Sequence, residues 1–199
     1  MKRGLWLLMA AVLLPAGSCQ VMQFGPSDGD GDFFSFEDGM QGWQARGTDL
    51  DEPPVDWSIQ RSDELADDGT TAVKLYLDNL NDRGKIWIER AFPLQPNQTY
   101  RVNVRYALAS ADFGDVNFWG IITGASAEPP QSAEELVYPD NTGNGAADDV
   151  GFVWLDKGYC FDASTGPDGL LHVFVGIWGV WEAPRTYYLD GLTVTFAEQ

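Results

Sequence analysis

Aromatic and hydrogen-bonding side chains alternate with apolar ones along several segments of this chain. From position 171 to 178, leucine, valine and isoleucine occupy the odd positions, whereas the even positions include His172 and Trp178. Because side chains alternate along a β-strand, the apolar set would face the core and His172 and Trp178 the opposite face. The same rule places on that face a further set of residues from other segments: Tyr76, Trp87, Glu89, Asn103, Arg105 and Trp119.

This mixture of residue types suits the recognition of sugars. A pyranose ring has an apolar face that stacks on indole or phenol, and its hydroxyl groups need donors and acceptors such as arginine, asparagine, glutamate and histidine. Trp87, Trp119 and Trp178 would provide the stacking surfaces. These residues are therefore the predicted ligand site of a carbohydrate-binding protein whose partner is a polysaccharide or glycan.

Two other uses of this face stay open. The long segment 124–149, which is rich in Pro, Gly, Asn and Asp, could cover the aromatic residues, or the face could contact a protein partner as part of a structural or assembly protein. The segment "WGVWEAPR", with Trp181 and Arg185, is an alternative position for a ligand site at the edge of the fold.

An enzyme is the least favoured alternative. A glycoside hydrolase needs two carboxyl groups on either side of the scissile bond. Glu89 could be one, but no second acid on a neighbouring strand shares its face, and Asp156 and Glu182 are only open possibilities. Cys160 and His172 stand in strand-like runs without a catalytic motif, so we expect no enzymatic activity.

The segments that position these residues are almost all strand-like. Runs rich in Val, Ile, Tyr, Phe and Trp recur between turn residues, and no helical period is sustained. Such regular short strands predict an all-β sandwich of eight to nine strands. We expect strands at 33–37, 55–61, 71–77, 84–92, 99–108, 115–122, 150–155, 169–178 and 186–196.

Four segments in order resemble the galactose-binding-domain-like jelly rolls, a group that includes many carbohydrate-binding modules. They are "FSFEDGMQGW", "DDGTTAVKLYL", "PLQPNQTYRVNVRYAL" and "TYYLDGLTVTF", and the likeness spans nearly all of residues 33–197. It implies an antiparallel jelly-roll β-sandwich whose first and last strands lie side by side. Phe34 and Phe36 would then enter the core, and Trp43 would pack across the end of the sandwich. Since this fold serves several functions, the resemblance implies the fold more strongly than the activity.

The resemblance also implies a structural calcium ion. Members of the group commonly hold calcium between an acid of the first strand, the loop before the third strand and an aspartate of the last strand. The corresponding residues here are Glu37, Asp68 and Asp190. Carboxylate and carbonyl oxygens from separate segments suit calcium. We expect calcium as a cofactor of the fold, and the alternative is that these acids are ordinary residues at strand ends.

The first nineteen residues are typical of an export signal. A basic tip precedes an apolar run from Leu5 to Leu14, which is too short for a permanent membrane span. The sequence "AGSC" resembles the lipobox of bacterial lipoproteins, which implies that Cys19 becomes the lipidated first residue of the mature protein. Pro15 departs from that pattern, and cleavage by an ordinary signal peptidase near Ser18 is the alternative.

The chain therefore divides into a signal peptide at 1–19, a flexible tether at 20–32 and one sandwich domain at 33–199. Acyl chains on Cys19 would hold the exported domain at a membrane without a spanning helix, and Gln20 favours the outer membrane or cell surface as the destination. The formal charge of -18 disfavours nucleic acid as a partner and any membrane contact except through the lipid anchor.

Overall fold

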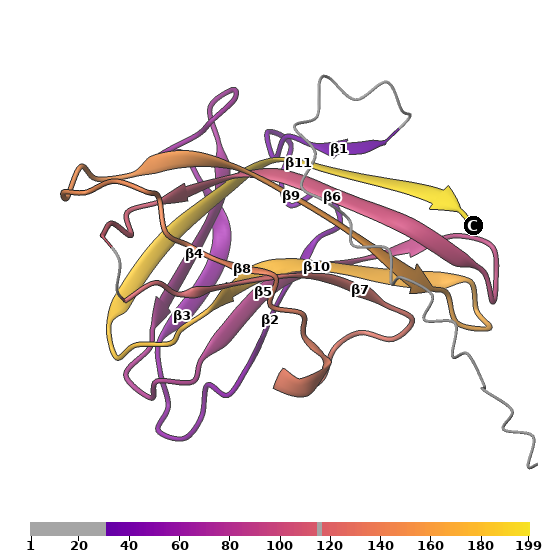
Figure 1. The fold of residues 1–199 in the computed structure, drawn as a ribbon, viewed down its shortest axis with the longest axis horizontal. Coiled ribbons are helices and arrows are strands. Elements are labelled where there is room, and N and C mark those ends of the chain that lie inside the picture. Colours follow the sequence, from indigo (N-terminus) through magenta and orange to yellow (C-terminus); the bar gives the residue numbers. More distant parts are fainter. Residues whose placement is uncertain (1–30, 115–116) are drawn as a thin grey trace, which may run out of the picture.

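The structure, a computed structural model that describes residues 31–114 and 117–199, consists of two antiparallel sheets packed face to face (Figure 1). Sheet A contains β1 (Asp32–Phe34), β3 (Trp57–Ser62), β4 (Ala72–Asp78), β6 (Thr99–Ser110), β9 (Val153–Ser164) and β11 (Pro184–Glu198). Sheet B contains β2 (Gln44–Thr48), β5 (Lys85–Pro93), β7 (Gly120–Ser126), β8 (Asp140–Asn141) and β10 (Leu170–Trp178). A short 3-10 helix, η1 (Ala133–Glu135), lies between β7 and β8. The predicted all-β jelly-roll sandwich is confirmed.

The order of the strands explains how distant segments meet. Sheet A runs β3-β4-β11-β6-β9, with β1 also paired to β11, and sheet B runs β2-β5-β10-β7-β8. The last strand, β11, is therefore central in sheet A, and β10 is central in sheet B. Both sheets end in strands with one open edge.

Alternation along the central strands builds the core. Val73, Leu75 and Leu77 of β4 point inward, and Ile86 and Ile88 of β5 meet them from sheet B; all are fully buried. The outward positions of the same strands carry polar or aromatic side chains. This pattern is what half-buried antiparallel strands require.

The start of the domain packs as the resemblance implied. β1 pairs antiparallel with β11, so that Phe34 lies opposite Leu192, and both Phe34 and Phe36 are buried. The indole of Trp43 is also buried, and its ring lies 5.4 Å from that of Phe34 in an edge-to-face arrangement. The predictions for these three aromatic residues are confirmed.

Three edge strands differ from the sequence-based expectation, and β7 begins five residues later than the strand expected at 115–122. β2 and β8 are additional strands, and β9 continues to Ser164 although its strand was expected to end at residue 155. All three are edge strands, paired on one side only. Such strands need fewer apolar residues, because one edge and part of one face meet solvent, and their sequence signal is correspondingly weak.

A bulge in β11 shapes the outer face of sheet A. The register with β6 shifts between Asp190 and Thr193, and the intervening Gly191 has a φ of 56°, in the left-handed region. Glycine adopts this conformation at little cost. The shift lets Asp190 and Thr193 both lie on the outer face, opposite Ala107 and Arg105.

Cys19, the signal peptide and the tether up to residue 30 lie outside the described residues. Within residues 31–114 and 117–199, no helix is long and apolar enough to cross a membrane.

Candidate functional site

The outer face of sheet B is aromatic and sealed. Trp87 of β5 and Phe174 of β10 are buried there together with Leu136, which follows η1. The ring of Tyr138 lies 4.9 Å from that of Trp178. Figure 1 shows the segment that carries η1 on the side of sheet B that faces away from sheet A. Residues 136–138 therefore cover Trp87 and pack against Trp178, two of the three tryptophans that were expected to stack on sugars.

A polar pair lies on this same face. The Nδ1 atom of His172 is 3.2 Å from Oε1 of Glu89, and the Glu89 side chain is only 5% exposed. The nearest cation to the other carboxylate oxygen is Arg46, whose Nε lies 4.0 Å from it. Glu89 and His172 thus stabilise each other beside the sealed aromatic cluster.

The predicted ligand residues do not share one face, so that part of the prediction is wrong. Trp119 lies in the core between the sheets, fully buried, with its ring 5.8 Å from that of Tyr187. The other residues divide between the sheets. Trp87, Glu89, His172 and Trp178 belong to sheet B, whereas Tyr76, Asn103 and Arg105 belong to sheet A. Alternation tells which side of its own sheet a residue occupies but not which sheet its strand joins.

The outer face of sheet A has a different construction. Along the central strand β6, Arg105 is followed on the outer face by the small residues Ala107 and Ala109. Beside these two alanines, the flanking strands place larger or charged side chains on both sides. The cross-strand rows are Trp154–Ala109–Tyr188, Asp156–Ala107–Asp190 and Gly158–Arg105–Thr193. Successive rows are about 7 Å apart along the strands. The face therefore has a low centre at Ala107 between raised sides.

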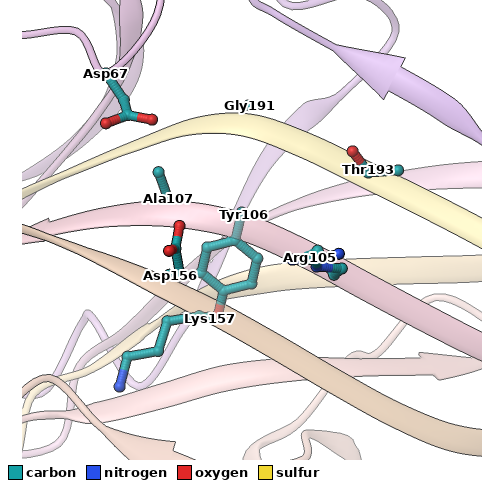
Figure 2. Close-up of a pocket in the computed structure, with 8 residues that line it drawn as sticks. All are labelled: Asp67, Arg105, Tyr106, Ala107, Asp156, Lys157, Gly191 and Thr193. Atoms are coloured by element: carbon teal, nitrogen blue, oxygen red, sulfur yellow. The ribbon is translucent and has the colours of Figure 1, made fainter. Parts of the chain in front are cut away.

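A pocket of about 200 Å³ occupies this low centre (Figure 2). Its lining consists of Asp67, Arg105, Tyr106, Ala107, Asp156, Lys157, Gly191 and Thr193. Gly158 beside it leaves open space, since a Cβ there would meet only Cγ of Arg105, at 3.7 Å. Pockets that enclose a whole small molecule are larger, roughly 300 Å³ and above. This pocket is suited to one unit of a longer ligand.

Figure 2 shows that the charges in the pocket are separated. The carboxylates of Asp67 and Asp156 lie on either side of Ala107 at one end, and Arg105 lies toward the other end. The Nζ atom of Lys157 points away and donates a hydrogen bond to Asp140, at 2.8 Å. The pocket thus offers acceptors at one end and a guanidinium at the other.

Aromatic side chains adjoin the acidic end of the pocket. We name Phe152, Trp154 and Tyr188 the aromatic shelf. The rings of Phe152 and Tyr188 are 5.2 Å apart, and the Tyr188 hydroxyl donates to Glu64 at 2.7 Å. Phe152 is 42% exposed and Trp154 is partly exposed, so the shelf presents ring surface to solvent.

The sequence carries a signal for this site. Trp154, Asp156 and Gly158 follow one another at every second position and so share a face of β9. A strand that ends at residue 155 leaves Asp156 and Gly158 in a loop, where alternation assigns no face. Asp67 lies in a loop, where alternation predicts nothing.

Glu37, one of the predicted calcium ligands, instead accepts hydrogen bonds from the loop of residues 67–71. Its Oε1 accepts hydrogen bonds from the backbone N–H groups of Thr70 and Thr71, each at 2.8 Å, and its Oε2 accepts one from the Thr70 hydroxyl. The Thr70 backbone bond, the Thr70 hydroxyl and the Thr71 backbone bond, in that order, lower the pKa of Glu37 to about 2.

Asp190 binds the same loop from the other side. Its Oδ2 accepts from the backbone N–H groups of Asp67, at 2.9 Å, and Asp68, at 3.1 Å, and its Oδ1 accepts from that of Gly191. Burial raises the pKa of Asp190, although these hydrogen bonds act in the opposite direction.

This donor set does not fit calcium. Glu37, Asp68 and Asp190 do meet at the loop of residues 67–71, as the resemblance implied, but Asp68 contributes an N–H group, and N–H donors face both other carboxylates. A cation at the same oxygens would face those positive dipoles. In the described part of the chain, no three His, Cys, Asp or Glu residues are grouped to hold a metal.

The alternative site in "WGVWEAPR" is divided as well. Trp181 is 50% exposed, whereas Arg185 turns inward, forms an ion pair with Asp112 and places its guanidinium 5.6 Å from the ring centre of Trp119. Trp181 and Arg185 therefore do not act on one ligand.

Comparisons with known proteins concern the fold. No protein-family model matches the chain, and no curated protein matches its sequence. Among solved structures, the K3 adhesin domain of Lys-gingipain from Porphyromonas gingivalis is 13% identical, with 82% of this chain and 96% of that domain covered and a TM-score of 0.53. The K1 adhesin domain of the same protein is 14% identical, with 84% and 98% covered and a TM-score of 0.51.

The structural neighbours also include carbohydrate-binding modules with a β-sandwich fold. The CBM22-1 xylan-binding domain of Paenibacillus barcinonensis Xyn10C is 16% identical, with 88% of this chain and 99% of that domain covered and a TM-score of 0.48. At such identities, the likeness to the two adhesin domains shows the fold alone.

Proposed function

We propose that this domain is a non-catalytic binding module that holds a stretch of polysaccharide on the outer face of sheet A. The observation that carries the proposal is the pocket over Ala107, with Asp67, Arg105 and Asp156 around it and the aromatic shelf beside it. Planar hydrogen-bonding groups next to exposed ring surface match the hydroxyl groups and the apolar face of a sugar.

The dimensions favour a polymer over a free monosaccharide. The rows of Trp154 and Asp156 are about 7 Å apart, so a sugar unit stacked on the shelf would leave its neighbour over the pocket. Water competes for each hydroxyl group, which makes a single site of this kind weak. Several copies on one surface would compensate through avidity.

Anchoring forms the second part of the proposal. A lipid on Cys19 would hold the exported domain at the outer membrane or cell surface, with residues 20–32 as the tether. Replacement of Cys19 by alanine should release the protein from the membrane fraction and abolish labelling by a radioactive fatty acid. Persistence of that label in the variant would show that the lipid is attached elsewhere.

The ligand proposal is tested by retention in gels that contain insoluble or soluble polysaccharides, together with a glycan array. Trp154→Ala and Asp156→Ala should each lose retention, and their circular dichroism should stay that of the parent fold. Trp181→Ala is the matched control, since it removes an exposed indole at the end of the sandwich. Loss of retention in the control alone would move the site to that end.

Two outcomes would replace the proposal. An absence of binding to every glycan, combined with capture of a defined protein partner that Asp156→Ala abolishes, would favour an assembly role for the same face. Release of reducing ends from a polysaccharide would show catalysis. Glu89 and Asp156 cannot form the carboxyl pair, because they lie on the outer faces of opposite sheets, but Asp67 and Asp156 line one pocket.

A further inference from the structure

Two exposed carboxylates, those of Asp67 and Asp156, line the acidic end of the pocket. Asp67 and Asp156 face Ala107 from both sides, and Asp190 lies opposite Ala107 in the sheet, fully buried beside them. The charge of Asp67 adds to burial in raising the pKa of Asp190. A raised pKa favours the neutral form of Asp190, and three backbone N–H groups already bind its oxygens. Asp67 and Asp156 therefore supply the negative charge of this end.

The ammonium group of Lys157 does not neutralise this end. The ammonium group of Lys157 is held by Asp140 and by the backbone oxygen of Asn141, at 2.8 and 3.3 Å. Figure 2 shows Arg105 toward the opposite end of the pocket. The formal charge of -18 on the whole chain adds a long-range attraction for positive ligands.

From this separation of charge we infer that the polysaccharide carries free amino groups, and that an ammonium group binds between Asp67 and Asp156. The inference rests on the proposed function and specifies its ligand class. An ammonium group offers three donors, and its hydrogen bonds to carboxylates are charge-assisted. Arg105 at the far end would then meet a hydroxyl or ring oxygen of the neighbouring unit. A uronic acid polymer would be repelled at the acidic end.

The experiment compares ligands that differ only in the charge of the nitrogen. Oligosaccharides of glucosamine and of galactosamine are titrated by calorimetry against the full domain, each beside its N-acetylated counterpart and beside an oligogalacturonate. The amine form should bind at least about tenfold more tightly than the acetylated form, since charged hydrogen bonds contribute more than neutral ones. Added salt should weaken binding of the amine form alone.

Matched variants test which residues cause the preference for the amine form. Asp156→Asn and Asp67→Asn should remove the preference for the amine, and Asp67→Asn leaves the backbone N–H that binds Asp190 in place. Asp162→Asn makes the same charge change on the same face of β9, where Asp162 pairs with Arg101, and should retain the preference. Melting temperatures within about 3 °C of the parent would show that the fold is unchanged.

The outcomes separate the inference from the proposed function. Equal affinity for the amine and acetylated forms, or a preference for the uronate, overturns the amine inference and leaves the polysaccharide site in place. Binding of polylysine as tight as that of the amine sugars overturns the sugar as the recognised group. A failure to bind every glycan on the array overturns both.

Discussion

The outer face of sheet B is covered by a loop segment, whereas the outer face of sheet A carries an open pocket. The face of sheet B has the larger aromatic cluster, yet Trp87 is 1% exposed, because residues 136–138 lie over it. The face of sheet A has small residues at its centre, and its pocket is open beside Asp67 and Asp156, which are both exposed. A sheet face rich in tryptophan can therefore be buried like a core, while a face with fewer aromatic residues can have the open space that a ligand needs.

The largest effect should come from removing the sealed indole. Trp87→Ala leaves a cavity under the covering segment and should lower the free energy of unfolding by about 3–5 kcal/mol, measured by urea denaturation. Retention on polysaccharide at a temperature where the variant is folded should be unchanged. A loss of retention with normal stability would show that the sheet B face binds the ligand.

A smaller loss is expected from the covering segment itself. Leu136→Ala should cost about 2 kcal/mol and should speed hydrogen exchange at the backbone N–H of Thr123, which donates to the Val137 oxygen at 3.1 Å. Val137→Ala, at an exposed side chain, is the control and should change stability by less than about 0.5 kcal/mol. Similar effects from both variants would mean that the segment is not packed through Leu136.

On the open face, filling the pocket should affect binding more than stability. Ala107→Leu would extend a side chain into the cavity of about 200 Å³ and should weaken polysaccharide binding at least about tenfold. Ala91→Leu, at an exposed position of sheet B, should leave binding as it was. Unchanged affinity in Ala107→Leu would remove the pocket from the site.

A structural feature can be predicted from this sequence when residues close together in the chain determine it. Features that depend on contacts between distant segments cannot be predicted in this way. The family resemblance correctly placed Phe34 and Phe36, and alternation correctly placed the inward residues of the central strands, since each strand shows by itself which of its sides is apolar. Alternation failed at Asp156, because an edge strand with Lys157 and Gly158 at its middle lacks a clear apolar period. The cover over Trp87 depends on contacts between residues about 50 positions apart, which no local pattern encodes.

The loop of residues 67–71 beside the open face should show a pH-dependent stability. The folded pKa of Glu37 is about 2, below the usual 4.5, so its contribution is complete above about pH 4.5 and is lost as the pH falls toward 2. Glu37→Gln should therefore lower the melting temperature near neutral pH, and the difference from the parent should vanish near pH 2. Asp38→Asn, at an exposed acid of the same turn, is the control.

The smallest effect is expected from a chelator. Because N–H donors face Glu37 and Asp190, addition of EDTA should leave the melting temperature unchanged, and added calcium should not raise it. A fall in melting temperature with EDTA that calcium reverses would instead establish the ion that the family resemblance implied.

The pairing of β1 with β11 also determines how the domain would be oriented if it is anchored through Cys19. Asp32 lies opposite Val194, near the end of the sandwich where the chain finishes, so the proposed anchor at Cys19 would hold the domain by that end. The opposite end carries the exposed side chains of Leu80 and Trp181, and it would point outward from the cell. A polymer bound over the rows of Trp154 and Asp156 would then lie along β6 and point away from the attached end.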